Sequence, residues 1–315
     1  MLFRYAFMLV LVICGLTMTT CNDKKDTVVE PVTGPYVTFK FKFDPNQARL
    51  GNLGQPVGVP AGHAAQNPSF RKFSIHYIEL AADQWTALGN GEILYRATET
   101  TVGGASAIDF DKSLVVREDT VFLRVPISTI KAGTYKWIRV SAAYQNYDVV
   151  FNLKVPVFGQ LIDQVGTISS FIGFNTYIHS FKPRTQTVTV NANETQGYWG
   201  FEYNLTGVPA PYSSGVQSGQ APAGATTVVN PLASTSPIPA GSCVITGQFT
   251  PSALTITGKE TNDIAVTLSF SINKSFEWVD TNGNGKWDGD VTTSPATLEP
   301  VTDMGLRGLV PTFTK

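Results

Sequence analysis

The chain has 315 residues, of which only 15% are charged, and its formal net charge is -1 at pH 7. Its 23 lysines and arginines are scattered along the sequence. Proteins that bind nucleic acid gather basic residues to neutralise phosphates, so we expect no nucleic-acid partner. A chain of this length buries enough apolar surface to fold without disulfide bonds.

The first 20 residues predict a signal peptide. A basic start ends at Arg4, and residues 5–20 carry no charge. A bilayer-spanning helix needs about 20 apolar residues, whereas this stretch is shorter and ends in polar threonines, as secretory signals do. We expect cleavage after Thr20. An uncleaved signal anchor and an ordinary cleaved signal are the alternatives.

Cys21 directly follows the expected cleavage point. The segment Met18-Thr19-Thr20-Cys21 resembles the lipobox of bacterial lipoproteins, in the looser form found in Bacteroidota. The resemblance implies that Cys21 carries acyl chains such as palmitate. Two or three such chains would anchor the protein durably in a membrane of the cell envelope, which we expect to be the outer membrane.

Residues 21–35 are typical of a flexible tether between this anchor and a folded body. They begin with the charged run Asn22–Asp26 and end with Gly34 and Pro35. In some Bacteroidota lipoproteins a charged cluster at this place directs the protein to the cell surface. The sequence leaves periplasmic and surface exposure both open.

Cysteine usage agrees with an anchor rather than a disulfide framework. Cys14 lies in the removed segment and Cys21 would be acylated, so only Cys243 remains. The residues around it, 241–246, include no His or Lys that would activate a thiol. We interpret Cys243 as a buried strand residue.

From Tyr36 onward, apolar residues recur at every second position, which is the pattern of strands with one buried face. Tyr77 is predicted to share a core face with Phe73 and Ile75, and Pro126 marks an edge strand. In the last strand, the outward positions are Ala265, Thr267, Ser269 and Ser271. The clearest predicted strands span 37–43, 72–77, 121–127, 135–140, 149–157, 199–205 and 264–272.

These strands, separated by turn residues and without a sustained helical stripe, predict an all-β fold. We expect an antiparallel β-sandwich over residues 36–315, extended or with a second β-rich subdomain. Residues 207–241 are uncharged and rich in Pro, Ser, Ala and Gly, which favours a long loop within this body. A boundary near 156–168 is the alternative.

Several strand segments resemble, in order, blocks of MbnP-like periplasmic β-sandwich proteins. These segments are Phe70–Leu80, Ile130–Tyr135, Leu254–Gly258 and Val266–Phe276. The resemblance implies a β-sandwich and, as an alternative function, an association with copper. No residue of this chain maps onto a copper ligand of that family.

The segment Asp280–Asp290, DTNGNGKWDGD, resembles the calcium loops of dockerins and EF-hands. Such loops place oxygen ligands at positions 1, 3, 5, 7 and 9, a glycine at position 6 and a bidentate Glu at position 12. Position 12 here is Val291, and Asp290 is the nearest substitute. We expect a structural Ca²⁺ site, with a polar hairpin turned by two Asn-Gly steps as the alternative. The predicted metal ligands are Asp280, Asn282, Asn284, the Lys286 carbonyl, Asp288 and Asp290.

Motifs for catalysis are missing from the sequence, which has no G-x-S-x-G, H-E-x-x-H, P-loop or C-x-x-C. The histidines His63, His76 and His179 are isolated in sequence, and their convergence in space would favour a metal or catalytic site. The five tryptophans are predicted to be mostly core residues, with a sugar-stacking surface as the second interpretation.

Two functions therefore stay open. The first is a non-enzymatic, membrane-anchored lipoprotein that binds a ligand or partner, such as a glycan or a protein, and carries a structural calcium loop. The second is a copper-associated periplasmic protein or an envelope hydrolase whose site is assembled from distant residues.

Overall fold

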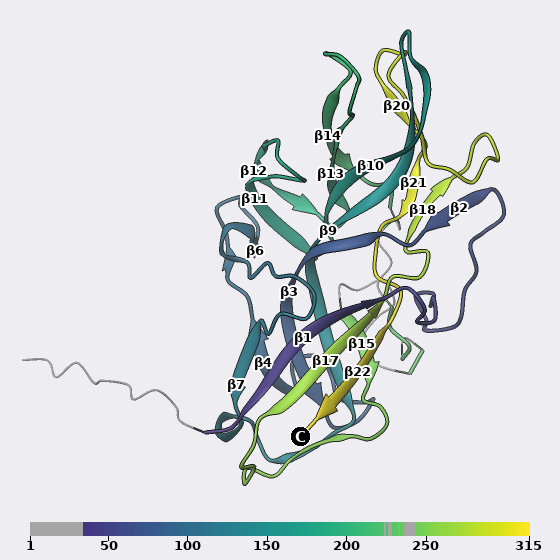
Figure 1. Ribbon diagram of the computed structural model, residues 1–315. Coiled ribbons are helices and arrows are strands. Elements are labelled where there is room, and N and C mark those ends of the chain that lie inside the picture. The colour runs from purple at the N-terminus through teal and green to yellow at the C-terminus, as the bar shows by residue number, and fades with distance from the viewer. Residues whose placement is uncertain (1–33, 224, 226–228, 233, 236–243) are drawn as a thin grey trace, which may run out of the picture. The chain divides into compact units, whose positions relative to one another are not determined.

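Strands make up nearly all the regular structure in the computed structural model, which describes residues 34–223, 225, 229–232, 234–235 and 244–315 (Figure 1). Two 3-10 turns, η1 (Phe110–Lys112) and η2 (Ile127–Thr129), are the helical elements among these residues. The all-β prediction is confirmed. Most pairings between described strands are antiparallel, and three are parallel: β1 with β17, β6 with β11, and β9 with β19.

One sheet of four strands has the order β22-β17-β1-β7. The predicted strand at 121–127 is shorter than expected, because the chain turns into η2 directly after Pro126. The strands of this sheet are β1 (Tyr36–Asp44), β7 (Leu123–Pro126), β17 (Ile264–Ser271) and β22 (Leu309–Thr314).

The largest sheet follows the order β14-β13-β10-β9-β19-β20, with β3 and β15 also paired to β9, and β4 paired to β3. Its strands are β3 (Ser69–Ala81), β4 (Glu92–Arg96), β9 (Trp137–Val155), β10 (Gly159–Phe171), β13 (Tyr198–Asn204), β14 (Ser214–Gln220), β15 (Val244–Gln248), β19 (Asp288–Asp290) and β20 (Thr297–Leu298).

Three smaller sheets complete the described fold. The first contains β5 (Glu99–Thr100), β6 (Ala107–Asp109), β11 (Asn175–Phe181) and β12 (Val188–Thr195), the second β8 (Gly133–Tyr135) and β16 (Leu254–Ile256), and the third β2 (His63–Gln66), β18 (Phe276–Val279) and β21 (Val301–Asp303).

β9 joins two segments that the sequence predicts as separate strands. Its core residues stand at even positions up to Ala142 and at odd positions from Tyr147 onward. The register against β3 shifts at Ala143, which is left without a direct partner between the pairs Ala142↔Ile75 and Tyr144↔Ser74. A β-bulge of this kind moves the alternation by one residue, so the two apolar runs lie on one face of β9, with the buried Gln145 between them.

A second bulge corrects the predicted orientation of Tyr77. The register shifts again at His76, so Ile75 and Ile78 contact one core, whereas Tyr77 pairs with Ser141 on the other face. Tyr77 is nevertheless only 6% exposed, because that face of β3 is also buried. The fully buried ion pair Glu79–Arg139, with an Oε2–Nη1 distance of 3.5 Å, lies in the same two strands.

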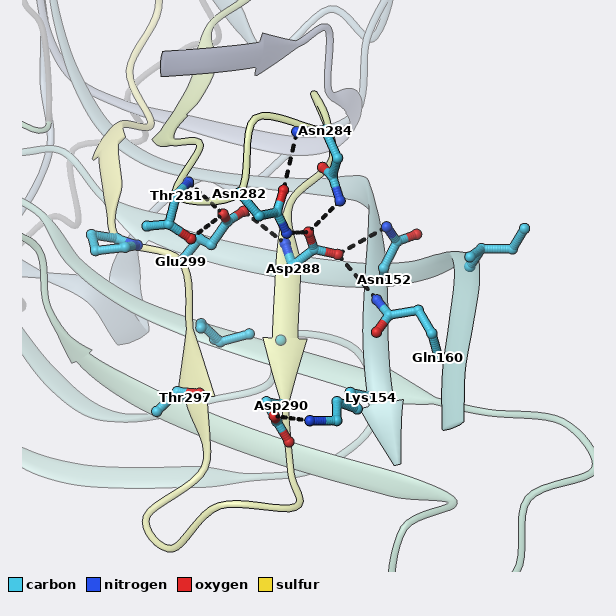
Figure 2. A pocket seen from close by; sticks show the side chains of 14 residues that line it. Asn152, Lys154, Gln160, Thr281, Asn282, Asn284, Asp288, Asp290, Thr297 and Glu299 are labelled. Atoms are coloured by element: carbon cyan, nitrogen blue, oxygen red, sulfur yellow. Dashed lines mark hydrogen bonds and ion pairs between the residues drawn. The ribbon is translucent and has the colours of Figure 1, made fainter. Parts of the chain in front are cut away.

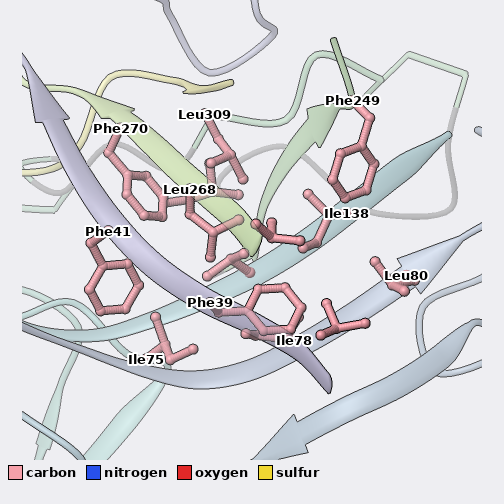
Figure 3. Close-up of a cluster of buried hydrophobic side chains, with 14 of the residues drawn as sticks. Phe39, Phe41, Ile75, Ile78, Leu80, Ile138, Phe249, Leu268, Phe270 and Leu309 are labelled. Atoms are coloured by element: carbon pink, nitrogen blue, oxygen red, sulfur yellow. The ribbon is translucent and has the colours of Figure 1, made fainter. Parts of the chain in front are cut away.

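The main core lies between the β22-β17-β1-β7 sheet and one half of the β3/β9 pair (Figure 3). Phe39 and Phe41 of β1 and Leu268 of β17 face Ile78 of β3 and Ile138 of β9, which is sandwich packing. A second core continues along the other half of β9, and Phe70 packs against both. This second core contains the aromatic residues Tyr147, Phe151, Phe201, Tyr203, Phe276, Trp278 and Trp287.

Two of the outward positions predicted in β17 are buried instead. Ser269 and Ser271 are 8% and 0% exposed. The segment that follows β1 covers them, and both hydroxyls donate to Gln47 in that segment. Ala265 is exposed and Thr267 is partly exposed. Alternation predicts which residues share a face, but a covering loop decides whether the second face reaches solvent.

The segments that the sequence left ambiguous contain regular structure. The uncharged stretch 207–241 includes β14, which pairs with β13 along its length, so it is not loop throughout. Residues 156–168 lie in the β9–β10 hairpin, and Gly34–Lys315 forms one compact unit. The strand expected to reach Val157 ends at Val155, since Val157 turns the hairpin with φ of 68°.

Candidate metal centre and the adjoining clefts

The loop that resembles a calcium site connects β18 to β19. It leaves β18 at Asp280 and re-enters a strand at Asp288, which pairs with β9. Gly283 and Gly285 have φ of 72° and 71°, a left-handed conformation that glycine adopts without steric cost. The glycines thus allow a turn tight enough to fold the polar side chains inward.

Backbone N–H groups orient the oxygens at the first three ligand positions. Asp280 accepts hydrogen bonds from the Asn284 and Gly285 backbones at 3.1 and 2.8 Å. Asn282 Oδ1 accepts from Asn284 N at 3.0 Å, and Asn284 Oδ1 accepts from Lys286 N at 2.7 Å. A carbonyl or carboxylate oxygen has two lone pairs, so each retains the capacity to bind a cation.

Asp288 is the point where the loop meets the β9–β10 hairpin (Figure 2). Its Oδ2 accepts from the amides of Asn282 and Asn284 at 2.7 Å each. Its Oδ1 accepts from Asn152 of β9 at 2.9 Å and from Gln160 of β10 at 3.1 Å. The oxygens of Asn152, Asn282 and Asn284 already accept backbone N–H groups, whereas the Gln160 amide can turn its oxygen toward a cation.

The two loop carboxylates lack positive partners. Within the described part of the chain, neither Asp280 nor Asp288 forms a salt bridge. The loop's own lysine, Lys286, reaches away to Asp163, with Nζ and Oδ1 2.7 Å apart. The Lys286 carbonyl oxygen accepts from the Trp278 indole at 3.0 Å. Two uncompensated carboxylates among neutral oxygen-bearing groups form a suitable environment for a divalent cation.

Asp290 lies apart from the other five predicted ligands. Its Oδ1 accepts from Thr292 N and Oγ1, and its Oδ2 lies 3.1 Å from Lys154 Nζ. Hydrogen bonds from Thr292 hold the pKa of Asp290 below its ordinary value, with a contribution from Lys154. Figure 2 shows the Asp290 and Asp288 side chains directed to separate partners.

Glu299 is a participant that the sequence analysis missed. It is 7% exposed, and its Oε1 accepts from Thr281 N and Oγ1 at 2.7 Å each, while Oε2 accepts from Asp288 N at 3.0 Å. It therefore holds both ends of the loop together. Glu299 lies eleven residues beyond Asp288, outside any loop spacing, so no local signal identifies it.

Every predicted donor atom of the loop is an oxygen, and oxygen donors suit Ca²⁺ better than a transition metal. Apart from Asp290, only two of the donors are carboxylates, and the described residues include no group of three or more His, Cys, Asp or Glu side chains that could hold a metal ion. Ca²⁺ takes six to eight oxygens and accepts amide and backbone carbonyls as well as carboxylates. Four side chains and the Lys286 carbonyl supply five positions, and a bidentate Asp288 or water would supply the rest.

A cleft of about 530 Å³ opens beside this loop. The β9–β10 hairpin contributes Lys154, Gln160 and Ile162 to its lining, and the segment 297–300 lies opposite. Ile162 is 64% exposed. The loop, the hairpin and this segment thus form one polar surface with an apolar edge.

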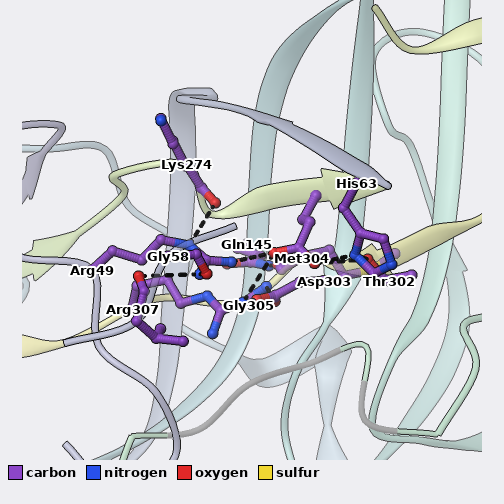
Figure 4. Close-up of polar contacts among 12 residues, drawn as sticks. Arg49, Gly58, His63, Gln145, Lys274, Thr302, Asp303, Met304, Gly305 and Arg307 are labelled. Carbon is purple, nitrogen blue, oxygen red and sulfur yellow. Dashed lines mark hydrogen bonds and ion pairs between the residues drawn. The ribbon is translucent and has the colours of Figure 1, made fainter. Parts of the chain in front are cut away.

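A second polar cluster surrounds Glu277 of β18, and Figure 4 shows its members Arg49, His63, Asp303 and Arg307. Glu277 forms an ion pair with Arg49 and a hydrogen bond with His63, at 2.6 Å from Nδ1 to Oε1. Arg307 lies 3.7 Å from Glu277 and pairs closely with Asp303. Burial lowers the pKa of Arg307 to about 10, and repulsion from Arg49 adds to this effect.

The three histidines have different surroundings. His63 contacts Glu277, whereas His76 Nε2 lies 3.0 Å from Glu99 Oε1, and His179 is exposed on β11. Burial lowers the pKa of His76, although Glu99 opposes this shift. No contact among the described residues joins these histidines into one site.

The tryptophans divide between core and surface. Trp278 and Trp287 are 1% and 2% exposed, Trp137 and Trp199 are half-buried, and Trp85 is 61% exposed. The core interpretation therefore holds for two of them. Trp199 lines a separate cleft next to the loop.

Cys21, Cys243 and the signal segment lie outside the described residues. The segments described within 34–315 contain no helix with the length and hydrophobicity of a membrane span. No family model matches the chain, and neither a curated protein nor a solved structure shows a significant match to it.

Proposed function

We propose that this chain is a non-enzymatic binding protein of the bacterial cell envelope, anchored in the outer membrane through acylated Cys21, with a structural Ca²⁺ in the loop after β18. The observation that supports it most is the pair Asp280 and Asp288. These carboxylates are surrounded by amide and carbonyl groups and lack a positive partner among the described residues.

Calcium explains the polar composition of the loop. The ligands are Asp280, Asn282, Asn284, the Lys286 carbonyl and Asp288, and Asp290 stays a candidate for completing the shell. When Ca²⁺ is bound, Asp288 Oδ2 binds the cation in place of the Asn282 and Asn284 amide N–H groups, and the oxygens of these two asparagines bind it through their second lone pairs. Extracellular calcium sites of this kind tolerate dissociation constants of roughly 10⁻⁴–10⁻³ M, because the surrounding concentration is high.

The cation would stabilise more than the loop. Asp288 is bonded to Asn152 and Gln160 on the β9–β10 hairpin, and Lys286 pairs with Asp163 on the same hairpin. Fixing Asp288 therefore fixes the lining of the adjacent cleft. A binding protein benefits from such rigidity, because an ordered site loses less entropy when its ligand binds.

Calorimetric titration of the purified chain with CaCl₂ tests the loop assignment. We expect one saturable site that Asp288→Asn weakens at least tenfold, because the substitution removes a charged ligand. Asp119→Asn is the matched control, since Asp119 is an exposed carboxylate with φ of 57°, a conformation that Asn also adopts. Equal calcium binding by wild type and Asp288→Asn would refute the site.

Metabolic labelling with radioactive palmitate tests the anchor. We expect label in the membrane fraction of cells that express the wild-type chain and none with Cys21→Ala. Incorporation that survives this substitution would show that Cys21 is not the acylated residue. Protease treatment of intact cells would then separate surface exposure from periplasmic exposure.

A hydrolase is the second candidate, and His76 is the observation that favours it. The His76–Glu99 pair lines a cleft of about 590 Å³ together with Arg96 and Phe174. A neutral imidazole held by a carboxylate is an arrangement found in general bases. Turnover of chromogenic esters or glycosides that His76→Asn abolishes would favour this function over the binding protein.

A further inference from the structure

A smaller cleft adjoins the cleft beside the calcium loop, and the segment 298–300 lies between the two. Its volume is about 280 Å³, close to the lower limit of the roughly 300–1,000 Å³ typical of small-molecule sites, which suits a single ring. Leu298, Glu299 and Pro300 line both this cleft and the one beside the loop. Trp199 and Trp287 provide its aromatic surface.

Trp199 presents its indole because its cross-strand neighbour is a glycine. Trp199 of β13 pairs directly with Gly219 of β14. A Cβ atom at position 219 would lie 3.6 Å from Cζ2 of the indole. Any longer side chain there would extend over the ring, so the glycine leaves the indole uncovered at this edge of the second core.

Two polar groups at this cleft have no hydrogen-bond partner within the described chain. They are the indole N–H of Trp199 and the side-chain amide of Gln217, which lies two residues before Gly219 on the same face of β14. The neighbouring Gln220 differs, because its amide is fixed by the Gln196 carbonyl and the Thr195 hydroxyl at 2.8 and 3.2 Å. One donor and one amide are thus available to a ligand.

The lining offers no free charge. Among the described lining residues Glu299 alone is ionisable, and its two carboxylate oxygens accept hydrogen bonds from Thr281 and Asp288 on the loop side. The remaining described lining is uncharged and, apart from Gln217 and Gln220, apolar, with Pro222 and Pro300 at exposed positions. A charged ligand would lose its hydration there without compensation.

We infer that this cleft binds one sugar ring of an uncharged glycan. The C–H face of a pyranose packs against the Trp199 indole, and its hydroxyls bond to the Gln217 amide and the indole N–H. Aromatic side chains suit such ligands because they combine a large apolar face with a polar edge. Gln217 provides both donor and acceptor for a hydroxyl.

Calcium would strengthen this binding, a statement that rests on the proposed calcium loop. Glu299 bonds to both ends of the loop through its carboxylate, and its carbonyl accepts from the Trp287 indole at 3.0 Å. Glu299 thus connects the calcium loop to Trp287, and both residues line the sugar cleft. A cation that orders the loop would therefore also order these lining residues.

Tryptophan fluorescence and calorimetry of the full chain in detergent with 5 mM CaCl₂ test the inference. The probes are maltotriose, cellotriose, laminaritriose, mannotriose and xylotriose. We expect at least one to bind with millimolar or better affinity, and we expect Trp199→Ala to weaken that binding at least tenfold. Trp85→Ala is the matched control, because Trp85 is exposed elsewhere, and it should bind as wild type does.

Gly219→Val keeps the indole and covers it, so it separates loss of binding from loss of folding. Position 219 is in a strand and not in the left-handed region, where valine is readily accommodated. We expect this variant to melt like wild type and to bind the sugar at least fivefold more weakly. Absence of binding for all five sugars, or unchanged binding by both Trp199→Ala and Gly219→Val, overturns the inference.

Removal of calcium tests the sugar cleft and the calcium loop independently of each other. We expect EDTA or Asp288→Asn to weaken sugar binding at least threefold while Trp199→Ala leaves calcium binding unchanged. Sugar binding that depends on Trp199 but not on calcium would overturn the coupling and support the cleft. Calcium binding without any sugar binding would support the loop and overturn the cleft.

Discussion

Glu277 lies within β18 and Asp280 follows its last residue, yet the two carboxylates have different surroundings. Glu277 is 4% exposed and meets Arg49, His63 and Arg307. Asp280 is partly exposed and accepts only backbone N–H groups. The strand thus separates a buried cluster whose charge is already balanced from a loop whose negative charge is not.

The difference indicates which of the two polar regions is stable without a bound cation. In the buried cluster, Arg49 and Arg307 offset Glu277 and Asp303, so an added cation would meet repulsion. In the loop, Asp280 and Asp288 meet dipoles rather than cations. Amide dipoles stabilise a carboxylate less than a charged partner does, so a divalent ion has more to contribute there.

Removing the charge of Glu277 should have the largest effect. Glu277→Gln leaves Arg49 beside a neutral amide, and loss of one partner of a buried ion pair costs about 3–5 kcal/mol of unfolding free energy. Urea denaturation measures this change. Lys40→Ala breaks the exposed pair with Asp119 and should cost about 1 kcal/mol or less. Similar losses for both variants would contradict the assignment of Glu277 to a structural cluster.

Calcium removal should have the next largest effect. A ligand at 100 times its dissociation constant stabilises the folded state by about 2.7 kcal/mol, so EDTA should lower the melting temperature of the calcium-loaded chain. Asp288→Asn should reduce this response by about half or more and Glu277→Gln should keep it, because only the first substitution alters the loop. If Glu277→Gln loses the response to EDTA and Asp288→Asn keeps it, the cation binds at the buried cluster and not in the loop.

The sequence predicted the loop and missed the cluster for physical reasons. The residues Asp280, Asn282, Asn284 and Asp288 lie within one turn of chain, so their spacing alone brings them together. Glu277 depends on Arg49, which is 228 residues away and is brought to it by the fold. Alternation in sequence does not identify such partners, and an arginine in a loop gives no sign that it is buried.

The same distinction applies to the strands. The regular alternation of β1 and β17 predicted both strands to within a residue, and their parallel pairing could not be anticipated from either alone. β9 was divided in the prediction because its bulge at Ala143 breaks the period. Val157 continues the alternation of Leu153 and Val155 in sequence and is therefore predicted to lie in the strand, whereas its φ of 68° places it in the turn, a conformation rare for a β-branched residue.

Asp290 provides the finest comparison, since it lies two residues from Asp288 and has cationic and hydroxyl partners of its own. Its lowered pKa keeps it ionised at neutral pH, so its position rather than its protonation decides whether it binds calcium. Lys154 and Thr292 already engage its oxygens. We therefore expect Asp290→Asn to weaken calcium binding less than threefold in calorimetry, compared with at least tenfold for Asp288→Asn. A loss as large as that of Asp288→Asn would mean that Asp290 releases Lys154 and supplies the missing ligand, because an outer charge on an exposed surface is screened too strongly to act from a distance.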